Sequence, residues 1–269
     1  MTILPEPAKR QDVIIPASGH DGLPPTTPCI DVFFAEMATD DASHQRDWTL
    51  LHADERERAD RFHFQRDRRM FVACRATLRT LLATYAGVLP QSLQFEFGAH
   101  GKPFLPHTGI SFNVSHAGSW FACATSVSSG ARADAASGIG TDIGIDIGID
   151  IEHMHPLSGL HAMAEHFFAP AEVQRLAEIP ENVRTRSFFE CWTRKEAVIK
   201  ATGEGVSRLL DSFEVAFGPD TEPALLRLDQ QRNPGWGMHT FDPAPGYVAA
   251  LTSPNYCLGR QSFHLPSST

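Results

Sequence analysis

Gly148-Ile149-Asp150-Ile151-Glu152 ends a run in which every odd position from Ile139 to Ile151 is isoleucine except Thr141, and every even one is glycine or aspartate. A period of two predicts a strand over 139–151, with its isoleucines facing a core. The opposite face then carries four carboxylates, those of Asp142, Asp146, Asp150 and Glu152.

A second acidic segment follows 46 residues later and reads as a helix. It runs Trp192-Thr193-Arg194-Lys195-Glu196-Ala197-Val198-Ile199-Lys200, and Gly203 provides a C-terminal stop. Glu196 and Lys200 are then one turn apart on one face. Carboxylates and a lysine from the two segments together can hold a divalent cation against a pyrophosphate.

The repeated strand leaves its own register open. Residues two apart on one strand face are roughly 6.5–7 Å apart, so Asp150 and Glu152 can approach one ion. A shift of four residues maps the run onto itself, which makes Asp146 and Asp142 rivals to Asp150. Only Asp150 has a carboxylate two residues on, and we therefore choose Asp150.

Composition is that of an ordinary globular protein. The 269 residues are 42% hydrophobic and 20% charged, enough for one large domain or two smaller ones. We expect a cytoplasmic protein, because the chain has no apolar run of about 18 residues and no secretory signal. The five scattered cysteines predict reduced thiols rather than a disulfide or zinc framework.

The net charge of −9 argues against a nucleic-acid-binding protein, although arginines concentrate locally. The helical pattern between Asp54 and Tyr85 carries eight of them: Arg56, Arg58, Arg61, Arg66, Arg68, Arg69, Arg75 and Arg79. This belt could bind an anionic ligand, or it could be a solvated helix surface balanced by neighbouring acids.

The order of elements predicts two α+β halves. Residues 1–28 are proline-rich and predict a flexible leader, 29–130 the N-terminal half, and 139–262 the C-terminal half with the metal site. In the first half we expect a strand at Ile30–Ala35, a helix over Asp54–Tyr85 broken near Phe64–Asp67, and strands near Leu93–Phe97, Phe112–His116 and Trp120–Thr125. In the second we expect the strand at 139–151, helices around 158–178 and 183–202, and strands near Phe213–Phe217, Trp236–Phe241 and Tyr247–Leu251.

Five motifs in register resemble those of the Sfp-type 4′-phosphopantetheinyl transferases. They are Gly101-Lys102-Pro103, Phe112-Asn113-Val114-Ser115-His116, the two acidic segments, and Gly203-Glu204-Gly205 continuing to Leu210-Asp211-Ser212-Phe213. The resemblance covers roughly residues 50–215. It implies a monomeric, Mg²⁺-dependent enzyme of two similar α+β halves, with coenzyme A in the cleft between them. Such an enzyme transfers the phosphopantetheine arm of coenzyme A to a serine of an acyl or peptidyl carrier protein and releases 3′,5′-ADP.

The resemblance also implies roles for individual residues. Asp150 and Glu196 match the metal ligands, Glu152 the third carboxylate, and Lys200 the pyrophosphate lysine. The implied coenzyme A contacts are Arg58 at the 3′-phosphate, Lys102 and Pro103 on the adenine side, and Asn113, Ser115 and His116 near the phosphates.

Three points stay open. The base that takes the serine proton is Glu196, directly or through water on the metal, with His116 as the rival. Glu55 stands where relatives can have a second 3′-phosphate lysine, and Arg69 or Arg75 could replace that contact. The apolar residues Leu157, Leu160, Met163, Phe167 and Phe168 form either a docking patch for the carrier protein or ordinary core.

Two other functions fit parts of the pattern. One is a different Mg²⁺-dependent enzyme of nucleotide diphosphates, but the chain has neither a P-loop nor a Gly-x-Gly-x-x-Gly motif. The other is a non-catalytic module that binds coenzyme A or a carrier, for which the loss of Asp150, Glu196 or Lys200 would be expected. All three are present.

Overall fold

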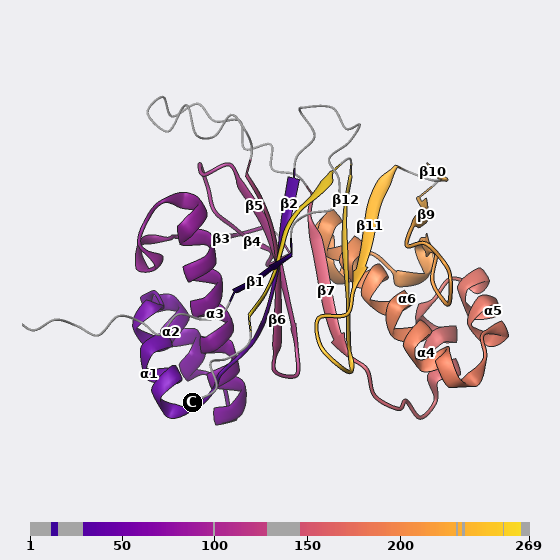
Figure 1. Cartoon of the computed structure of the whole chain (residues 1–269), viewed down its shortest axis with the longest axis horizontal. Helices are drawn as coiled ribbons and strands as arrows, with labels where there is room; N and C mark the ends of the chain where they lie inside the picture. Colours follow the sequence, from indigo (N-terminus) through magenta and orange to yellow (C-terminus); the bar gives the residue numbers. More distant parts are fainter. Residues whose placement is uncertain are drawn as a thin grey trace, which may run out of the picture.

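Two β-sheets lie face to face between two groups of helices, so that the molecule has four layers (Figure 1). The computed structural model describes residues 12–15, 29–98, 100–127, 146–229, 231–232, 235–254 and 256–264. The first group of helices contains α1 (Asp41–Leu50), α2 (Ala53–Asp60) and α3 (Gln65–Ala86). The second contains α4 (Leu160–Phe167), α5 (Pro170–Glu178) and α6 (Glu181–Thr202). The predicted α+β class with two halves is confirmed.

The first sheet has the strand order β1-β13-β2-β6-β5, and the second has the order β11-β12-β7. The bounds of the first are β1 (Asp12–Ile15), β13 (Cys257–His264), β2 (Cys29–Glu36), β6 (Trp120–Val127) and β5 (Ile110–Ala117). Those of the second are β11 (Trp236–Phe241), β12 (Tyr247–Pro254) and β7 (Gly148–His153). The short elements are β3 (Glu96–Phe97) with β4 (Pro103–Phe104), β8 (Glu214–Val215) with β9 (Leu225–Leu228) and β10 (Gln231–Arg232), and the 3₁₀ turns η1 (Pro90–Ser92), η2 (Gly205–Ser207) and η3 (Leu210–Ser212).

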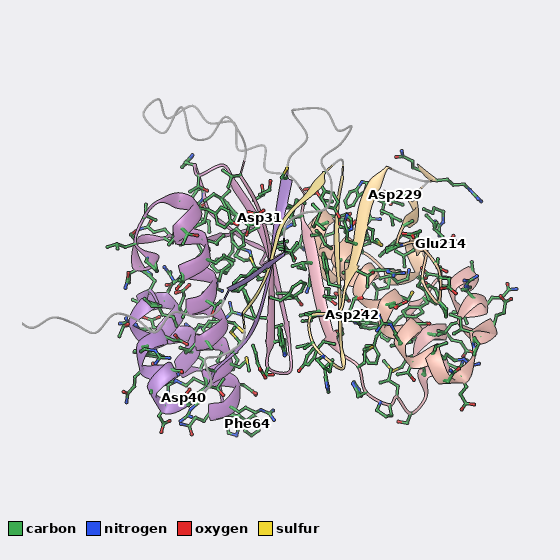
Figure 2. The ribbon with its side chains drawn as sticks, in the orientation of Figure 1. Asp31, Asp40, Phe64, Glu214, Asp229 and Asp242 are labelled. Atoms are coloured by element: carbon green, nitrogen blue, oxygen red, sulfur yellow. The ribbon has the colours of Figure 1, made fainter. Side chains whose placement is uncertain are left out.

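Side chains fill the three spaces between the four layers (Figure 2). One core lies between α3 and the first sheet, a second between the two sheets, and a third between the second sheet and α4–α6. Asp40 and Phe64 lie with the first group of helices, whereas Glu214 and Asp229 lie in the other half (Figure 2). Among the described helices, none combines the length and apolar character needed to cross a membrane.

The isoleucines of β7 face the core between the sheets, as the period of two predicts. Ile147, Ile149 and Ile151 are at most 1% exposed and pack against residues of β2 and β6. Helix α6 packs against the opposite face of β7, the face that carries the carboxylates, and buries Asp150. Residues 139–145 of the predicted strand lie outside the described residues.

The helix boundaries follow the local sequence signals. The expected break near Phe64–Asp67 is real, because α2 ends at Asp60 and α3 begins at Gln65. Helix α6 ends as predicted at Gly203, whose φ of 71° is left-handed backbone that glycine adopts at no steric cost.

The two ends of the chain meet in the first sheet. Strand β1 falls within the segment predicted as a leader and pairs with β13, which in turn pairs in parallel with β2. The C-terminal segment therefore supplies a strand to the sheet of the first half. The prediction of reduced thiols is wrong for Cys29, which is in a disulfide, although Cys74, Cys123 and Cys191 are free. The residue opposite Cys29 in the register of β13 is Cys257, a proximity that sequence spacing does not reveal.

A buried ion pair ties α2 to α3. The Arg79 side chain, 2% exposed, donates from Nε to Oε2 of Glu55 over 2.6 Å, and Glu55 is 6% exposed. Arg79 Nη1 also donates to the carbonyls of Pro90 and Leu93. The same Glu55 oxygen accepts the backbone N–H of His52 at the start of α2. Glu55 is thus a structural residue rather than part of a phosphate site.

We expect Glu55→Ala to lower the free energy of unfolding by about 3–5 kcal/mol, because it leaves the buried Arg79 charge uncompensated. Urea denaturation followed by circular dichroism measures the change. Asp60→Asn is the matched control on the same helix: Asp60 pairs with Arg68 in an exposed setting, and its loss should cost less than about 1 kcal/mol. Equal costs for the two variants would contradict a structural role for Glu55.

Candidate active site

The site is built on an unusually close approach between β7 and α6. A Cβ added to Gly148 would lie 1.8 Å from the carbonyl oxygen of Ala197 and 2.6 Å from the backbone nitrogen of Ala201. Only glycine fits there. The contact sets the last turns of α6 directly over the carboxylate face of β7, since Gly148 shares that face with Asp150 and Glu152.

Asp150 is the centre of the site and is 4% exposed. Its Oδ1 accepts from Lys200 Nζ at 2.6 Å and from Ser115 Oγ at 2.8 Å. Lys200 Nζ also donates to Ser115 Oγ at 2.8 Å, so β5, β7 and α6 each contribute one member of this triad. The other oxygen, Oδ2, is buried and has no hydrogen-bond partner among the described residues.

Two further carboxylates lie within electrostatic reach of Asp150. Burial, then the charge of Asp150, raises the pKa of Glu152 to about 7, while Lys200 and a hydrogen bond from the Trp192 indole oppose the rise. Burial and Asp150 also raise the pKa of Glu196, again against Lys200. The charge of Asp150 disfavours ionisation of the two partly buried glutamates, and Lys200 provides the nearby positive charge.

These residues fit a magnesium ion, which prefers oxygen ligands and keeps several of its waters. Within the described ranges, no three side chains already converge as a finished metal cluster. The unpartnered Oδ2 of Asp150 nevertheless offers a buried acceptor beside the Lys200 ammonium. Asp146, the rival to Asp150, lies before β7 and is exposed, so the strand register favours Asp150.

The polar residues of the Asn-Val-Ser-His segment on β5 make different contacts. Asn113 is buried, and its Oδ1 accepts the backbone N–H of Ile149 at 2.9 Å, which joins the two sheets. Ser115 belongs to the triad. His116 is exposed, yet the triad affects its ionisation. Partial burial and then the charge of Lys200 lower the pKa of the His116 ring, whereas the charge of Asp150 opposes the shift. The predicted ligand contact thus remains geometrically open for Ser115 and His116, whereas Asn113 has a structural use.

Lys102 reaches the same region from the other half. It follows Gly101 in the turn of the β3–β4 hairpin, and its Nζ donates to backbone carbonyls of Lys200, Ile147 and Ala201. Burial lowers the pKa of Lys102, and Asp146 opposes that shift. Pro103 begins β4 and is partly exposed, as a ligand contact requires.

The arginines divide between surface and interior. Arg58 is exposed and lies over the Phe71 ring at 5.3 Å, so it is accessible to an anion. Arg75 pairs with Glu55 over 3.4 Å, and Arg69 donates to the Thr39 carbonyl and to Asp41. Both candidates for the second 3′-phosphate contact are therefore already engaged with protein groups.

The apolar segment proposed for docking belongs largely to the core. Leu160 and Phe168 are buried members of the third core, and Leu157, Met163 and Phe167 pack against it partly buried. The core alternative therefore accounts for most of this segment.

Sequence reasoning missed two residues that support the site. Trp192 hydrogen bonds Glu152, and its rings stack on Phe188 at 6.1 Å. Lys195, next to Glu196, is 0% exposed and joins Glu172 over 2.7 Å as well as two carbonyls of the following segment. The sequence contains a signal for Trp192, its place four residues before Glu196 on a helix face, but none for Lys195.

Comparisons with known proteins show which family the chain resembles. Residues 39–128 match the family model described as 4′-phosphopantetheinyl transferase, N-terminal, and residues 146–252 match the 4′-phosphopantetheinyl transferase superfamily. The chain is 37% identical to the 4′-phosphopantetheinyl transferase HetI of Nostoc sp., over 75% of this chain and 77% of that protein. It is 30% identical to a 4′-phosphopantetheinyl transferase of Bacillus subtilis and 27% identical to Sfp of the same species, each over 77% of this chain and 84% of the relative.

We expect Gly148→Ala to destabilise the protein by about 3 kcal/mol, since the added methyl group forces α6 away from β7. Thermal and urea unfolding measure the change. Gly98→Ala is the control, because its Cβ would meet nothing closer than 3.7 Å and should leave stability nearly unchanged. If Gly148→Ala proved as stable as Gly98→Ala, the close approach would not constrain the site.

Proposed function

The chain belongs to the 4′-phosphopantetheinyl transferase superfamily, and we propose how its own residues carry out the transfer. It is an enzyme that moves 4′-phosphopantetheine onto a carrier protein. In our proposal the donor is coenzyme A and the acceptor is a serine hydroxyl. The serine oxygen forms a bond to the phosphorus that carries the pantetheine arm, the pyrophosphate P–O bond breaks, and 3′,5′-ADP leaves with the electron pair.

The buried triad of Asp150, Lys200 and Ser115 carries this proposal. The partly buried Lys200 ammonium and the buried, unpartnered carboxylate oxygen of Asp150 suit a ligand that has both phosphate oxygens and a divalent cation. Asp150, Glu152 and Glu196 would hold Mg²⁺. When bound, this ion neutralises charge on the pyrophosphate.

In this proposal Lys200 stabilises the negative charge of the leaving group. The Lys200 ammonium donates one hydrogen bond to Asp150 and one to Ser115, and Glu196 lies one turn away on α6. A phosphate oxygen next to this ammonium would meet a partly buried positive charge, which would offset the charge that develops on the departing phosphate.

Glu196 is our choice for the base that takes the serine proton. Burial and Asp150 raise its pKa towards the range in which a carboxylate accepts protons efficiently. His116 is the rival, because a lowered pKa keeps its ring neutral and able to accept. If Glu196 is the base, His116→Gln should retain most of the maximal rate.

The nucleotide end of coenzyme A would lie towards the first half. The exposed Arg58 is suited to the 3′-phosphate, and Pro103 with the backbone of its turn is suited to the adenine side. We also propose that the enzyme is cytoplasmic and monomeric. The carrier protein that it accepts defines the pathway in which it acts.

Incubation with coenzyme A, Mg²⁺ and an apo carrier protein should increase the carrier mass by one phosphopantetheine group, as read by intact-mass spectrometry. EDTA should abolish the gain and excess Mg²⁺ should restore it, because three carboxylates alone repel a pyrophosphate. An undiminished mass gain in EDTA would overturn the metal assignment. Binding of coenzyme A without any mass gain on several carriers would favour the non-catalytic module.

Asp150→Asn should reduce the transfer rate on the order of 10²- to 10³-fold, because the buried anion that orients Lys200 and offers a metal ligand is lost. Asp146→Asn removes an exposed carboxylate from the same repeated run and should change the rate little. Steady-state rates with one carrier protein measure both. Equal losses of rate in the two variants would contradict the choice of Asp150 over Asp146.

A further inference from the structure

The backbone of Lys102 is held at the end of a tight turn. The N–H of Gly98 donates to the Lys102 carbonyl at 2.9 Å, and Gly101 has a φ of 78°. The turn also lies against the segment that follows α6, since a Cβ on Gly205 would be 3.4 Å from the Cβ of His100. The backbone thus carries the Lys102 side chain from the first half into the second.

The ammonium of Lys102 is fully used by backbone carbonyls of the other half. Nζ donates to the carbonyl oxygens of Lys200 at 2.7 Å, Ile147 at 3.1 Å and Ala201 at 3.4 Å. An ammonium has three protons, so three acceptors occupy it completely. Two of these carbonyls belong to the last turn of α6, where helix carbonyls lack intrahelical partners and favour a cation.

These contacts hold two backbone positions that border the candidate active site. Ile147 immediately precedes Gly148, where β7 meets α6, and Lys200 is the residue whose side chain contacts Asp150. One ammonium therefore joins the residue before β7 to the last turn of α6.

We propose that Lys102 is a positioning residue for the transfer reaction: it locks the last turn of α6 so that the Lys200 ammonium stays against Asp150 and Ser115. The inference rests on the proposed role of Lys200. It departs from the adenine-side contact implied by the family resemblance, because a side chain committed to three carbonyls has no donor left for a nucleotide.

The two roles differ in the kinetic parameter that they control. A positioning residue affects the rate of the bound complex, and a displacement of about 1 Å can cost on the order of 10²-fold. A nucleotide contact that is made equally in the ground state and the transition state affects KM instead.

The test is a double-mutant cycle of Lys102→Met and Lys200→Met, measured as kcat and KM for coenzyme A. We expect Lys102→Met to lower kcat about 10²-fold with KM changed less than about threefold. In the Lys200→Met background the same substitution should cost little further, since the group that Lys102 positions is already gone. A rise in KM with kcat preserved, or losses that multiply, would overturn the inference.

Three controls make the outcomes distinct. Glu96→Gln, an exposed position on the same hairpin, should leave both parameters unchanged. Lys102→Gln keeps two donors and should recover part of kcat, which a general loss of stability would not do; thermal unfolding checks that all variants fold. If Lys200→Met alone retains the full rate, the proposed role of Lys200 fails, whereas multiplicative losses with a slow Lys200→Met overturn only the role of Lys102.

Discussion

The contact between Gly148 and the Ala197 carbonyl sets the distance on which the rest of the site depends. A strand and a helix normally pack through their side chains, but here the backbones approach so closely that a Cβ would lie 1.8 Å from the oxygen. This approach places Asp150 under Lys200 and brings Glu196 within the field of Asp150. The isoleucines on the other face of β7 hold the strand against the first sheet, so that the carboxylate face cannot turn away.

The site brings three carboxylates together in a buried or partly buried setting, which is unfavourable for the folded state. Burial raises the pKa values of Glu152 and Glu196, and Asp150 raises both further. The fold tolerates this because Lys200 supplies a counter-charge and because neighbouring contacts are satisfied, including the Lys195–Glu172 pair at the base of α6. Unfavourable electrostatic repulsion at one place, surrounded by groups whose hydrogen bonds and ion pairs are satisfied, is typical of functional sites.

The sequence predicted the parts of the structure that depend on local pattern. The alternation of isoleucine placed β7 and its core face, and Gly203 placed the end of α6. The sequence did not reveal partners that lie far apart in the chain. No local signal shows that α6 covers Asp150, and none shows that Glu55 pairs with Arg79, which lies 24 residues away. Lys102 belongs to a motif of the family, but the motif does not indicate which atoms accept hydrogen bonds from its ammonium.

Strand β13 has a consequence for how the protein is made. It lies between β1 and β2, and residues 257–264 are the last of the described chain to leave the ribosome. Until they emerge, the edge of β2 that β13 will cover is unpaired, although the helices and strands of the first half were completed long before. The first sheet therefore cannot close as an independent unit during translation. That edge of β2 is open to pairing with other strands from the time it emerges until residues 257–264 follow.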